Sequence, residues 1–239
     1  KKFARESIKK NPDTLLVVGG DGTILTILKE ADDLDYKKPI GIIPLGTSNY
    51  FARNLGFDLS IKDAIERVKK GKTTELYLPE ANGNYFTLML TIGLTTAVSE
   101  NIEVKFKQRF GQFAYVFEAF RQLAKKDAFT YEVTVDGEKT YKGITHQIVV
   151  ANADLNTQLQ VVPGSKMNEQ WLRLSIYEDN DSKLRLLFML IGYVFTLGRY
   201  KKGLRSIKAK TIDIKTTPTQ SSAVDGEPVT STPLSVKIH

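Results

Sequence analysis

The sequence contains no cysteine and only two histidines, His146 and His239, in 239 residues. Disulfide bonds and thiol chemistry are therefore excluded, and a zinc centre or catalytic triad built on histidines is nearly excluded as well. The absence of cysteine is compatible with a reducing cytoplasm. Any catalytic acid, base or metal ligand must be sought among the carboxylates, hydroxyls and lysines.

Long apolar runs are missing too. The longest, residues 186–198, is shorter than the roughly 20 residues that a membrane-spanning helix needs. Neither a Walker A motif nor the Gly-x-Gly-x-x-Gly of dinucleotide-binding folds occurs. Acidic residues are outnumbered, with 27 Asp and Glu against 34 Lys and Arg, a net charge of +7. This balance favours an anionic partner, whether nucleotide, anionic lipid surface or nucleic acid.

The most informative segment is Gly19-Gly20-Asp21-Gly22-Thr23, which lies between an apolar run at 15–18 and a predicted helix at 24–31. Glycines let backbone N–H groups approach an anion closely, and the helix N-terminus adds positive charge. The Asp21 carboxylate would repel a bare phosphate, so it fits if it holds a metal ion or orients a water or hydroxyl. The alternative is a tight turn with a solvated aspartate.

A second glycine turn, Pro44-Leu45-Gly46-Thr47-Ser48-Asn49, follows a predicted strand at 40–43 and opens a predicted helix that ends before Gly56. Parallel strands end at one edge of a sheet, so both turns are expected there. Thr47, Ser48 and Asn49 add hydroxyl and amide groups suited to phosphate oxygens or a ribose. The pair predicts a nucleotide phosphate cradle.

Two domains are expected. Residues 1–79 alternate between helices and strands and predict an α/β domain with a parallel sheet. Residues 80–221 predict a β-rich, sandwich-like domain with inserted helices, and the tail 222–239 is an optional further part of the first domain. Extended segments are predicted at 74–78, 85–92, 129–135, 143–151 and 172–177. The inserted helices, at 106–123 and 183–200, either pack on the sheets or dock on a membrane.

An Asp-Gly-Glu sequence occurs twice, at 136–138 and at 225–227, and each copy is predicted to form a turn between strands. The first copy lies between two alternating segments and is interpreted as an ordinary hairpin turn. Local sequence alone does not rank the second copy above the first.

The two glycine turns together resemble the bacterial lipid kinases of the diacylglycerol kinase catalytic-domain family, which are similar to diacylglycerol and sphingosine kinases and more distantly to NAD kinases. The likeness continues through residues 92–94, 109–115, 162–164, 224–227 and 232–234. It implies a diacylglycerol kinase- and NAD kinase-like fold, and a further segment before residue 1.

The resemblance also implies a site. It assigns ATP binding to Gly19, Gly20, Asp21, Gly22, Thr23, Gly46, Thr47 and Asn49. It makes Glu227 the base that takes the proton of a lipid hydroxyl, with Asp225 beside it and Asp21 in the network of Mg²⁺ and water. Glu169 is a second candidate metal ligand. Tyr50 departs from the family pattern, which has an aspartate after the asparagine.

The expected function is an ATP- and Mg²⁺-dependent lipid kinase that phosphorylates diacylglycerol or a related lipid alcohol. The alternatives are a catalytically weak lipid- or nucleotide-binding homologue and an NAD kinase-like enzyme. We expect a cytoplasmic protein that associates peripherally with membranes and binds ATP and a lipid. A homodimer is a further option, and nucleic acid is not expected.

Overall fold

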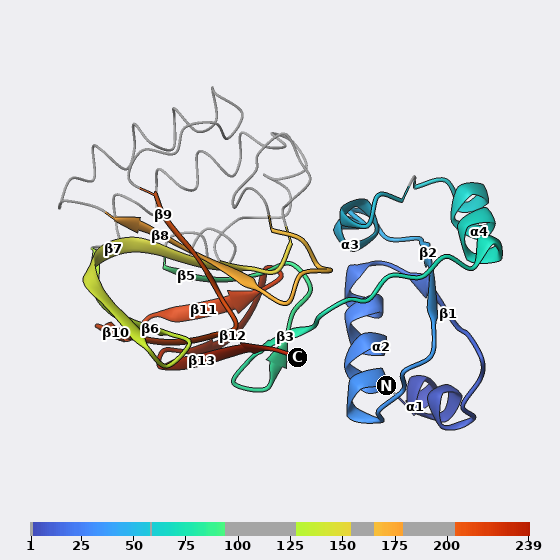
Figure 1. Ribbon diagram of the computed structural model, residues 1–239, viewed down its shortest axis with the longest axis horizontal. Coiled ribbons are helices and arrows are strands. Elements are labelled where there is room, and N and C mark those ends of the chain that lie inside the picture. Colours follow the sequence, from blue (N-terminus) through green and yellow to red (C-terminus); the bar gives the residue numbers. More distant parts are fainter. Residues whose placement is uncertain (1, 58, 94–127, 154–164, 179–203) are drawn as a thin grey trace.

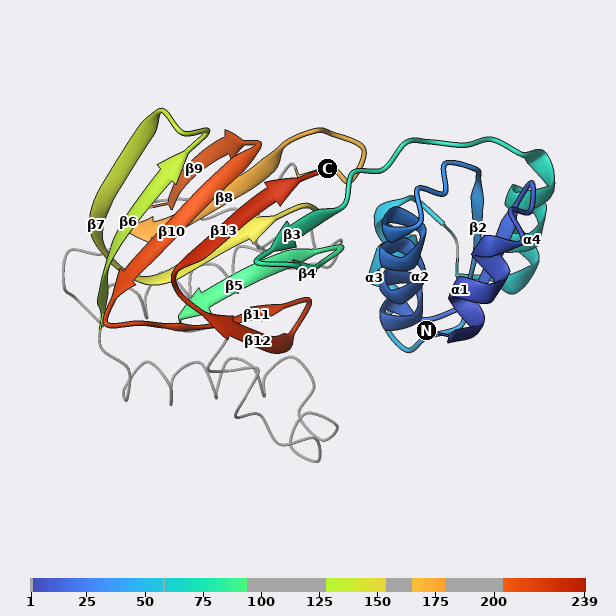
Figure 2. The same ribbon diagram turned by 90° about the horizontal axis from the view of Figure 1, so that it is seen from below.

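The computed structural model describes residues 2–57, 59–93, 128–153, 165–178 and 204–239. Two bodies lie side by side, with the N-terminal body at the right of Figure 1 and the β-rich body at the left. The segment 71–78 runs from one to the other, as the view in Figure 2 also shows. The helices expected at 106–123 and 183–200 lie outside the described residues.

The N-terminal body alternates helices and strands, as predicted. Its elements are α1 (Lys2–Lys9), β1 (Leu15–Gly19), α2 (Asp21–Asp33), β2 (Ile40–Pro44), α3 (Tyr50–Asn54) and α4 (Ile61–Lys70). β1 and β2 pair in parallel, with Leu15 opposite Ile40 and Gly19 opposite Pro44. Both strands therefore end at one edge of the sheet, which has two strands among the described residues.

The helix boundaries follow from local chemistry. α4 begins after Ser60, whose hydroxyl accepts a hydrogen bond from the Asp63 amide at 3.3 Å, and ends at Gly71 with φ +63°. α2 begins at Asp21, three residues before the predicted start. Its first turn includes Gly22. Glycine lowers the stability of the helix little at this position, because the amides of a first helical turn have no intrahelical partner.

The β-rich body is one sheet of eleven strands among the described residues. Its strands are β3 (Pro79–Ala81), β4 (Asn84–Tyr85), β5 (Met89–Gly93), β6 (Phe129–Val135), β7 (Lys139–Ala151), β8 (Leu172–Glu178), β9 (Leu204–Ala209), β10 (Thr211–Thr217), β11 (Ser221–Val224), β12 (Glu227–Ser231) and β13 (Leu234–Ile238). The strand predicted at 74–78 is wrong, because that segment has no partner strand. The sheet begins with β3 instead.

The C-terminal tail belongs to the β-rich body. β11 pairs with β5, β12 with β11, and β13 lies between β10 and β3. Leu234 and Val236 alternate inward from β13 and are buried in the same core as Ile212 and Ile214 of β10. The tail therefore does not join the N-terminal domain, an option that its sequence allowed, but pairs with the strands of the β-rich body.

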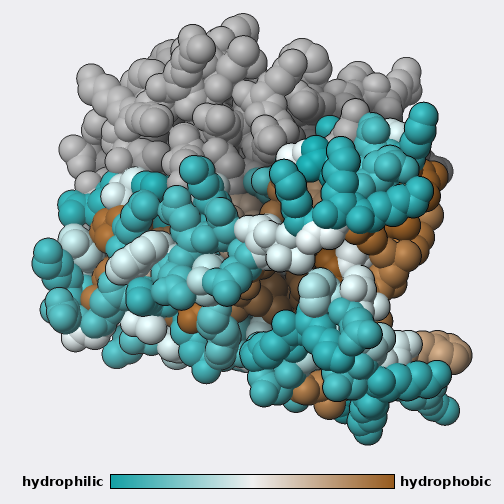
Figure 3. Space-filling model, turned by 45° about the vertical axis from the view of Figure 1, so that its right-hand side comes forward, coloured by the Kyte–Doolittle hydropathy of each residue, from teal (hydrophilic) through white to brown (hydrophobic). Residues whose placement is uncertain are grey.

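A second apolar cluster joins the two bodies. Its buried members from the N-terminal body are Val17, Ile24, Ile42 and Phe51, and those from the β-rich body include Leu88, Met89, Val149 and Ala151. Figure 3 shows hydrophobic residues deep in the recess between the two bodies. In Figure 1, α2 and α3 are the elements of the N-terminal body that face the β-rich body, and Ile24 and Phe51 enter the cluster from them. No described helix has the length and apolarity needed to cross a bilayer.

Candidate functional site

The two glycine turns are in direct backbone contact. A Cβ on Gly46 would lie 2.5 Å from the Cα of Gly20, and a Cβ on Gly20 would lie 2.9 Å from the Cα of Gly46. The Leu45 amide donates to the Gly19 carbonyl at 3.0 Å, which extends the pairing of β1 and β2 into the turns. A side chain at either glycine would force the turns apart, so only glycine fits at both. The predicted meeting of the turns at one edge is confirmed.

Asp21 ties the first turn to the helix after the second. Its two carboxylate oxygens accept hydrogen bonds from the backbone amides of Tyr50, at 3.1 Å, and Phe51, at 2.9 Å. These amides open α3, so Asp21 supplies from a distant segment the acceptor that an N-cap side chain usually provides. Each carboxylate oxygen retains a second lone pair for another ligand.

Asn49 shapes the second turn. It lies at the N-cap position of α3, with φ 49° and ψ 42°, but its side chain makes no cap hydrogen bond to α3. Its Oδ1 accepts from the Gly46 amide at 2.8 Å, and its Nδ2 donates to the Gly46 carbonyl at 2.7 Å. Asparagine adopts the left-handed region more readily than most residues. The buried Asn49 amide therefore closes the loop that carries the exposed Thr47.

The start of α2 is open to an anion. Gly22 and Thr23 are exposed, and a Cβ on Gly22 would meet no atom within 4 Å. The N-cap residue, Gly20, has no side chain to satisfy the first amides of the helix. These amides and the helix dipole favour an anionic group at this point.

Asp225 fixes the turn between β11 and β12. One carboxylate oxygen accepts from the amide and the hydroxyl of Thr87, at 2.7 and 2.9 Å, and the other accepts from the amides of Leu88 and Met89, at 2.8 and 3.0 Å. Burial raises the pKa of the Asp225 carboxyl, and the hydrogen bonds act in the opposite direction. With four donors on its oxygens, Asp225 holds the turn in place rather than facing an open site.

Glu227 begins β12, two residues after Asp225, and is exposed. Because the Asp225 carboxylate is bound to the 87–89 segment, and Leu88 and Met89 pack with the N-terminal body, the turn that carries Glu227 is attached near the boundary between the bodies. The structure thus brings Asp225 and Glu227 together on one turn, and Asp21 and the glycines together on the other side of that boundary.

The other Asp-Gly-Glu sequence has the same local geometry in a different place. Asp136 and Asp225 have φ of 52° and 50°, and each following glycine also has a positive φ. The Asp136 carboxylate accepts from the amides of Lys210 and Thr211, at 2.8 and 2.9 Å, within the β-rich body. The predicted hairpin at 136–138, between β6 and β7, is confirmed. Position in the fold therefore distinguishes the two copies, as local sequence could not.

Glu169 is paired with a cation. Its carboxylate lies 3.2 Å from the Lys208 ammonium, in a surface ion pair. Among the residues that the structure describes, no three His, Cys, Asp or Glu side chains gather as a metal cage. The carboxylate of Asp21 does fit Mg²⁺ held jointly with nucleotide phosphates, because such ions take one or two protein carboxylates and complete their shell with phosphate and water.

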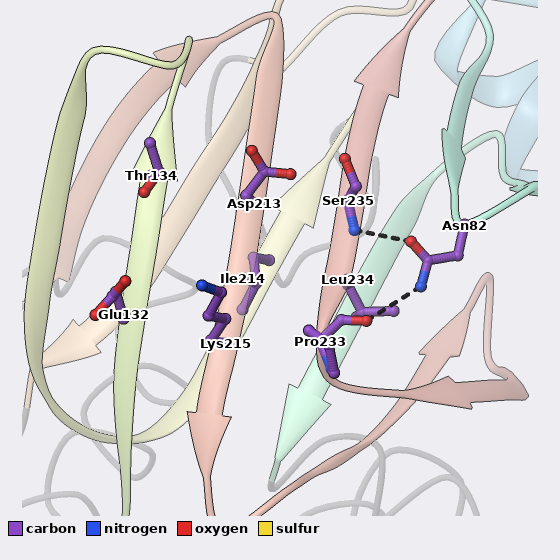
Figure 4. Close-up of a pocket in the computed structure, with 9 residues that line it drawn as sticks. All are labelled: Asn82, Glu132, Thr134, Asp213, Ile214, Lys215, Pro233, Leu234 and Ser235. Atoms are coloured by element: carbon purple, nitrogen blue, oxygen red, sulfur yellow. Dashed lines mark hydrogen bonds between the residues drawn. The ribbon is translucent and has the colours of Figure 1, made fainter.

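Sequence reasoning missed Thr87, whose hydroxyl and amide both bind Asp225. It also missed a groove of about 420 Å³ on the β-rich body, lined by residues of β6, β10 and β13 and by Asn82. Figure 4 shows Asn82 bonded to Pro233 and Ser235 at one end of this groove, with Glu132, Asp213 and Lys215 farther along. The groove contains none of the predicted site residues.

Comparison with known proteins identifies two family domains. The model of the diacylglycerol kinase catalytic domain matches residues 1–81, and the model of the YegS C-terminal NAD kinase beta sandwich-like domain matches residues 89–239. A protein of Staphylococcus epidermidis named "putative lipid kinase" is 27% identical over 240 residues, which cover 100% of this chain and 78% of that protein. One of Staphylococcus aureus with the same description is 26% identical over 96% of this chain and 75% of its own length.

Solved structures show the same fold. The crystal structure of a "putative diacylglycerol kinase" from Bacillus anthracis matches with a TM-score of 0.80 and 24% identity, over 100% of this chain and 77% of that one. An NAD kinase from Archaeoglobus fulgidus in complex with ATP matches with a TM-score of 0.50 and 13% identity, over 100% of this chain and 84% of that one. The two-body arrangement is thus shared with both.

Proposed function

Because the chain belongs to the family of proteins that join a diacylglycerol kinase catalytic domain to a YegS-type C-terminal domain, we propose that it is an ATP-dependent lipid kinase. It transfers the γ-phosphate of ATP to the hydroxyl of diacylglycerol or of a related lipid alcohol. The predicted family is confirmed; the reaction and the roles of the residues that follow are proposals.

The observation that carries this proposal is the union of the two glycine turns through Asp21. The amides at the start of α2 and the exposed Thr47 provide donors for the ATP phosphates. Asp21 holds α3 against the first turn, which keeps these donors in one arrangement before the nucleotide arrives. When bound with the nucleotide, Mg²⁺ supplies neutralisation of the charge on the transferred phosphoryl group, and Asp21 is the residue that would hold it.

Glu227 acts as the base. The lipid oxygen forms a bond to the γ-phosphorus while the bond to the bridging oxygen of ADP breaks, and the hydroxyl proton passes to the Glu227 carboxylate. Exposure leaves this carboxylate available to a substrate hydroxyl. Asp225 positions Glu227 through its four hydrogen bonds to the 87–89 segment. We assign it no proton transfer.

Tyr50 supports the second candidate, a catalytically weak binding protein. Its amide donates to Asp21 and its side chain packs, half-buried, against the apolar cluster between the bodies. A carboxylate at this position would add a second acid beside Asp21. Without it, phosphate binding depends on the turns and Asp21 alone, and transfer depends on Glu227.

Transfer of radiolabelled phosphate from ATP to a lipid extract tests the proposal, with nucleotide binding measured in parallel by calorimetry. Glu227→Gln is expected to abolish transfer and to leave ATP binding unchanged, whereas Asp21→Asn is expected to weaken both. Glu138→Gln is the matched control, because it makes the same change in the other Asp-Gly-Glu turn. ATP binding without transfer by the wild type would establish the weak binding protein, and formation of NADP would establish an NAD kinase.

We propose a cytoplasmic enzyme that meets its substrate at the membrane surface. A lipid alcohol with long acyl chains resides in a bilayer, and the net charge of +7 favours an anionic one. Co-sedimentation with vesicles measures this association. Binding that is stronger to vesicles with anionic lipid than to neutral vesicles, and that is weakened by salt, is the expected result.

A further inference from the structure

A hydrogen bond crosses the boundary between the two bodies. The Tyr85 hydroxyl, on β4, donates to the Asp32 carboxylate, near the end of α2, at 2.9 Å. On the same helix Lys29 places its ammonium 5.4 Å from the centre of the Tyr85 ring, and His239 stacks on that ring with centroids 6.0 Å apart. Burial and the bond to Asp32 raise the pKa of Tyr85 to about 12, so its hydroxyl remains a donor at neutral pH.

This contact is attached to both halves of the proposed site. Asp21 and Asp32 lie on one helix, eleven residues or about 16 Å apart, so a rotation of α2 at Asp32 also moves Asp21. On the other side, Tyr85 precedes Thr87 by two residues, and Thr87 binds Asp225 through both its amide and its hydroxyl. Asp225 in turn precedes Glu227 by two residues.

Packing alone leaves room at this boundary. A cavity of about 190 Å³ lies between the bodies, and Asp32 and Thr87 are both among its lining residues, together with Leu28, Phe51 and Asn152. Leu28 and Phe51 belong to the apolar cluster that joins the bodies, and the space beside them shows that this packing is incomplete. A directed hydrogen bond beside the cavity restricts the angle between the bodies where packing does not.

We propose that Asp32 and Tyr85 are positioning residues that set the distance between Asp21 and Glu227, and hence the alignment of the γ-phosphate with the lipid hydroxyl. This inference rests on the proposed kinase function. Neither residue touches the nucleotide turns or the Glu227 turn directly. Loss of the bond should therefore affect the transfer step more than ATP binding, since misplacement of reacting groups by about 1 Å costs up to 100-fold in rate.

The test combines kinetics with a distance measurement on the complete protein. Tyr85→Phe removes the hydroxyl and keeps the ring, and Asp32→Asn removes the charge and keeps one acceptor oxygen. Tyr141→Phe is the control, because Tyr141 is on β7 and packs against the core of the β-rich body. As the chain has no cysteine, spin labels at Lys62→Cys on α4 and Lys139→Cys on β7 report the separation of the bodies.

We expect Tyr85→Phe to lower kcat roughly tenfold, to change the KM for ATP less than twofold, and to broaden the distribution of label distances. Asp32→Asn should lower kcat and broaden the distance distribution to a smaller extent, and Tyr141→Phe should change neither. An unchanged distance distribution in Tyr85→Phe, or a changed one with unaltered kcat, overturns the inference. If the wild type transfers no phosphate, the proposed function fails, while a broadened distribution still supports the role of the pair in orienting the bodies.

Discussion

The contact between the glycine turns makes opposite predictions for two Gly→Ala substitutions. At Gly46 the added Cβ would lie 2.5 Å from the Cα of Gly20 and 2.8 Å from the Oδ1 of Asn49, so backbone must move. Overpacking typically costs 1–3 kcal/mol. Because a main-chain atom is the closest neighbour and cannot rotate away, we expect the upper end, about 3 kcal/mol off the free energy of unfolding.

At Gly22 the same methyl group enters open space. No heavy atom lies within 4 Å of its Cβ position, and the residue is in the first turn of α2. Alanine is favoured over glycine in helices by up to about 1 kcal/mol, so Gly22→Ala should leave stability unchanged or slightly raised. The methyl group would, however, project at the surface where the ATP phosphates are proposed to bind. We expect ATP affinity to fall at least tenfold.

Urea unfolding followed by circular dichroism measures the first effect, and calorimetric titration with ATP measures the second. A thermal scan should show Gly46→Ala melting lower by roughly 6–12 °C, given ~2–4 °C per kcal/mol for a chain of this size. The reasoning is refuted if Gly46→Ala is as stable as the wild type, because the turns would then not be in contact. It is also refuted if Gly22→Ala binds ATP with wild-type affinity.

Three further substitutions probe individual contacts. Asp225→Asn should lower the free energy of unfolding by about 2–3 kcal/mol, because its amide group would face the donors of the 87–89 segment, and an unchanged urea midpoint would contradict the assigned bonds. Asn49→Ala should cost about 1–2 kcal/mol through loss of both bonds to Gly46 and the strain of a positive φ, measured in the same way. The raised pKa of Tyr85 predicts a contribution to stability that is complete below pH 10 and lost as the pH rises through about 12. Tyr85→Phe should therefore flatten the decline of the urea midpoint between pH 10 and 12, and an unchanged slope would argue against the bond to Asp32.

Helices and strands were predictable where apolar residues recur at a regular spacing and a cap or turn residue marks an end. The helix at 61–70 has apolar residues at helical spacing between Ser60 and Gly71, and the strand at 129–135 alternates up to the Asp136 turn. The error at 74–78 has a different origin. That segment is extended, but a strand also needs a partner, and there the Tyr77 amide donates to the Met167 carbonyl in a loop.

The positions of the two glycine turns could be predicted, whereas the bonds between them could not. Asp21 binds the amides of Tyr50 and Phe51. Because every residue type except proline supplies a backbone amide, the sequence does not indicate which residues bind this carboxylate. The contact of Asp225 with Thr87 spans 138 residues and likewise ends partly on main-chain atoms. Only the fold brings these groups together, which is why local sequence could not separate the two Asp-Gly-Glu turns.

The two hydrogen bonds that Asp21 accepts from the amides of Tyr50 and Phe51 affect how the Gly-Gly-Asp-Gly motif is interpreted in relatives of this protein. Its carboxylate is part of the architecture, since α3 loses its amide acceptors without it. Selection for folding alone would then preserve the motif in a lineage that no longer transfers phosphate. The side chain of Glu227 is exposed and does not hold another described element in place as Asp21 holds α3. With Glu227 as the base that we propose, the residue at that position in an alignment is the better guide to which relatives have remained enzymes.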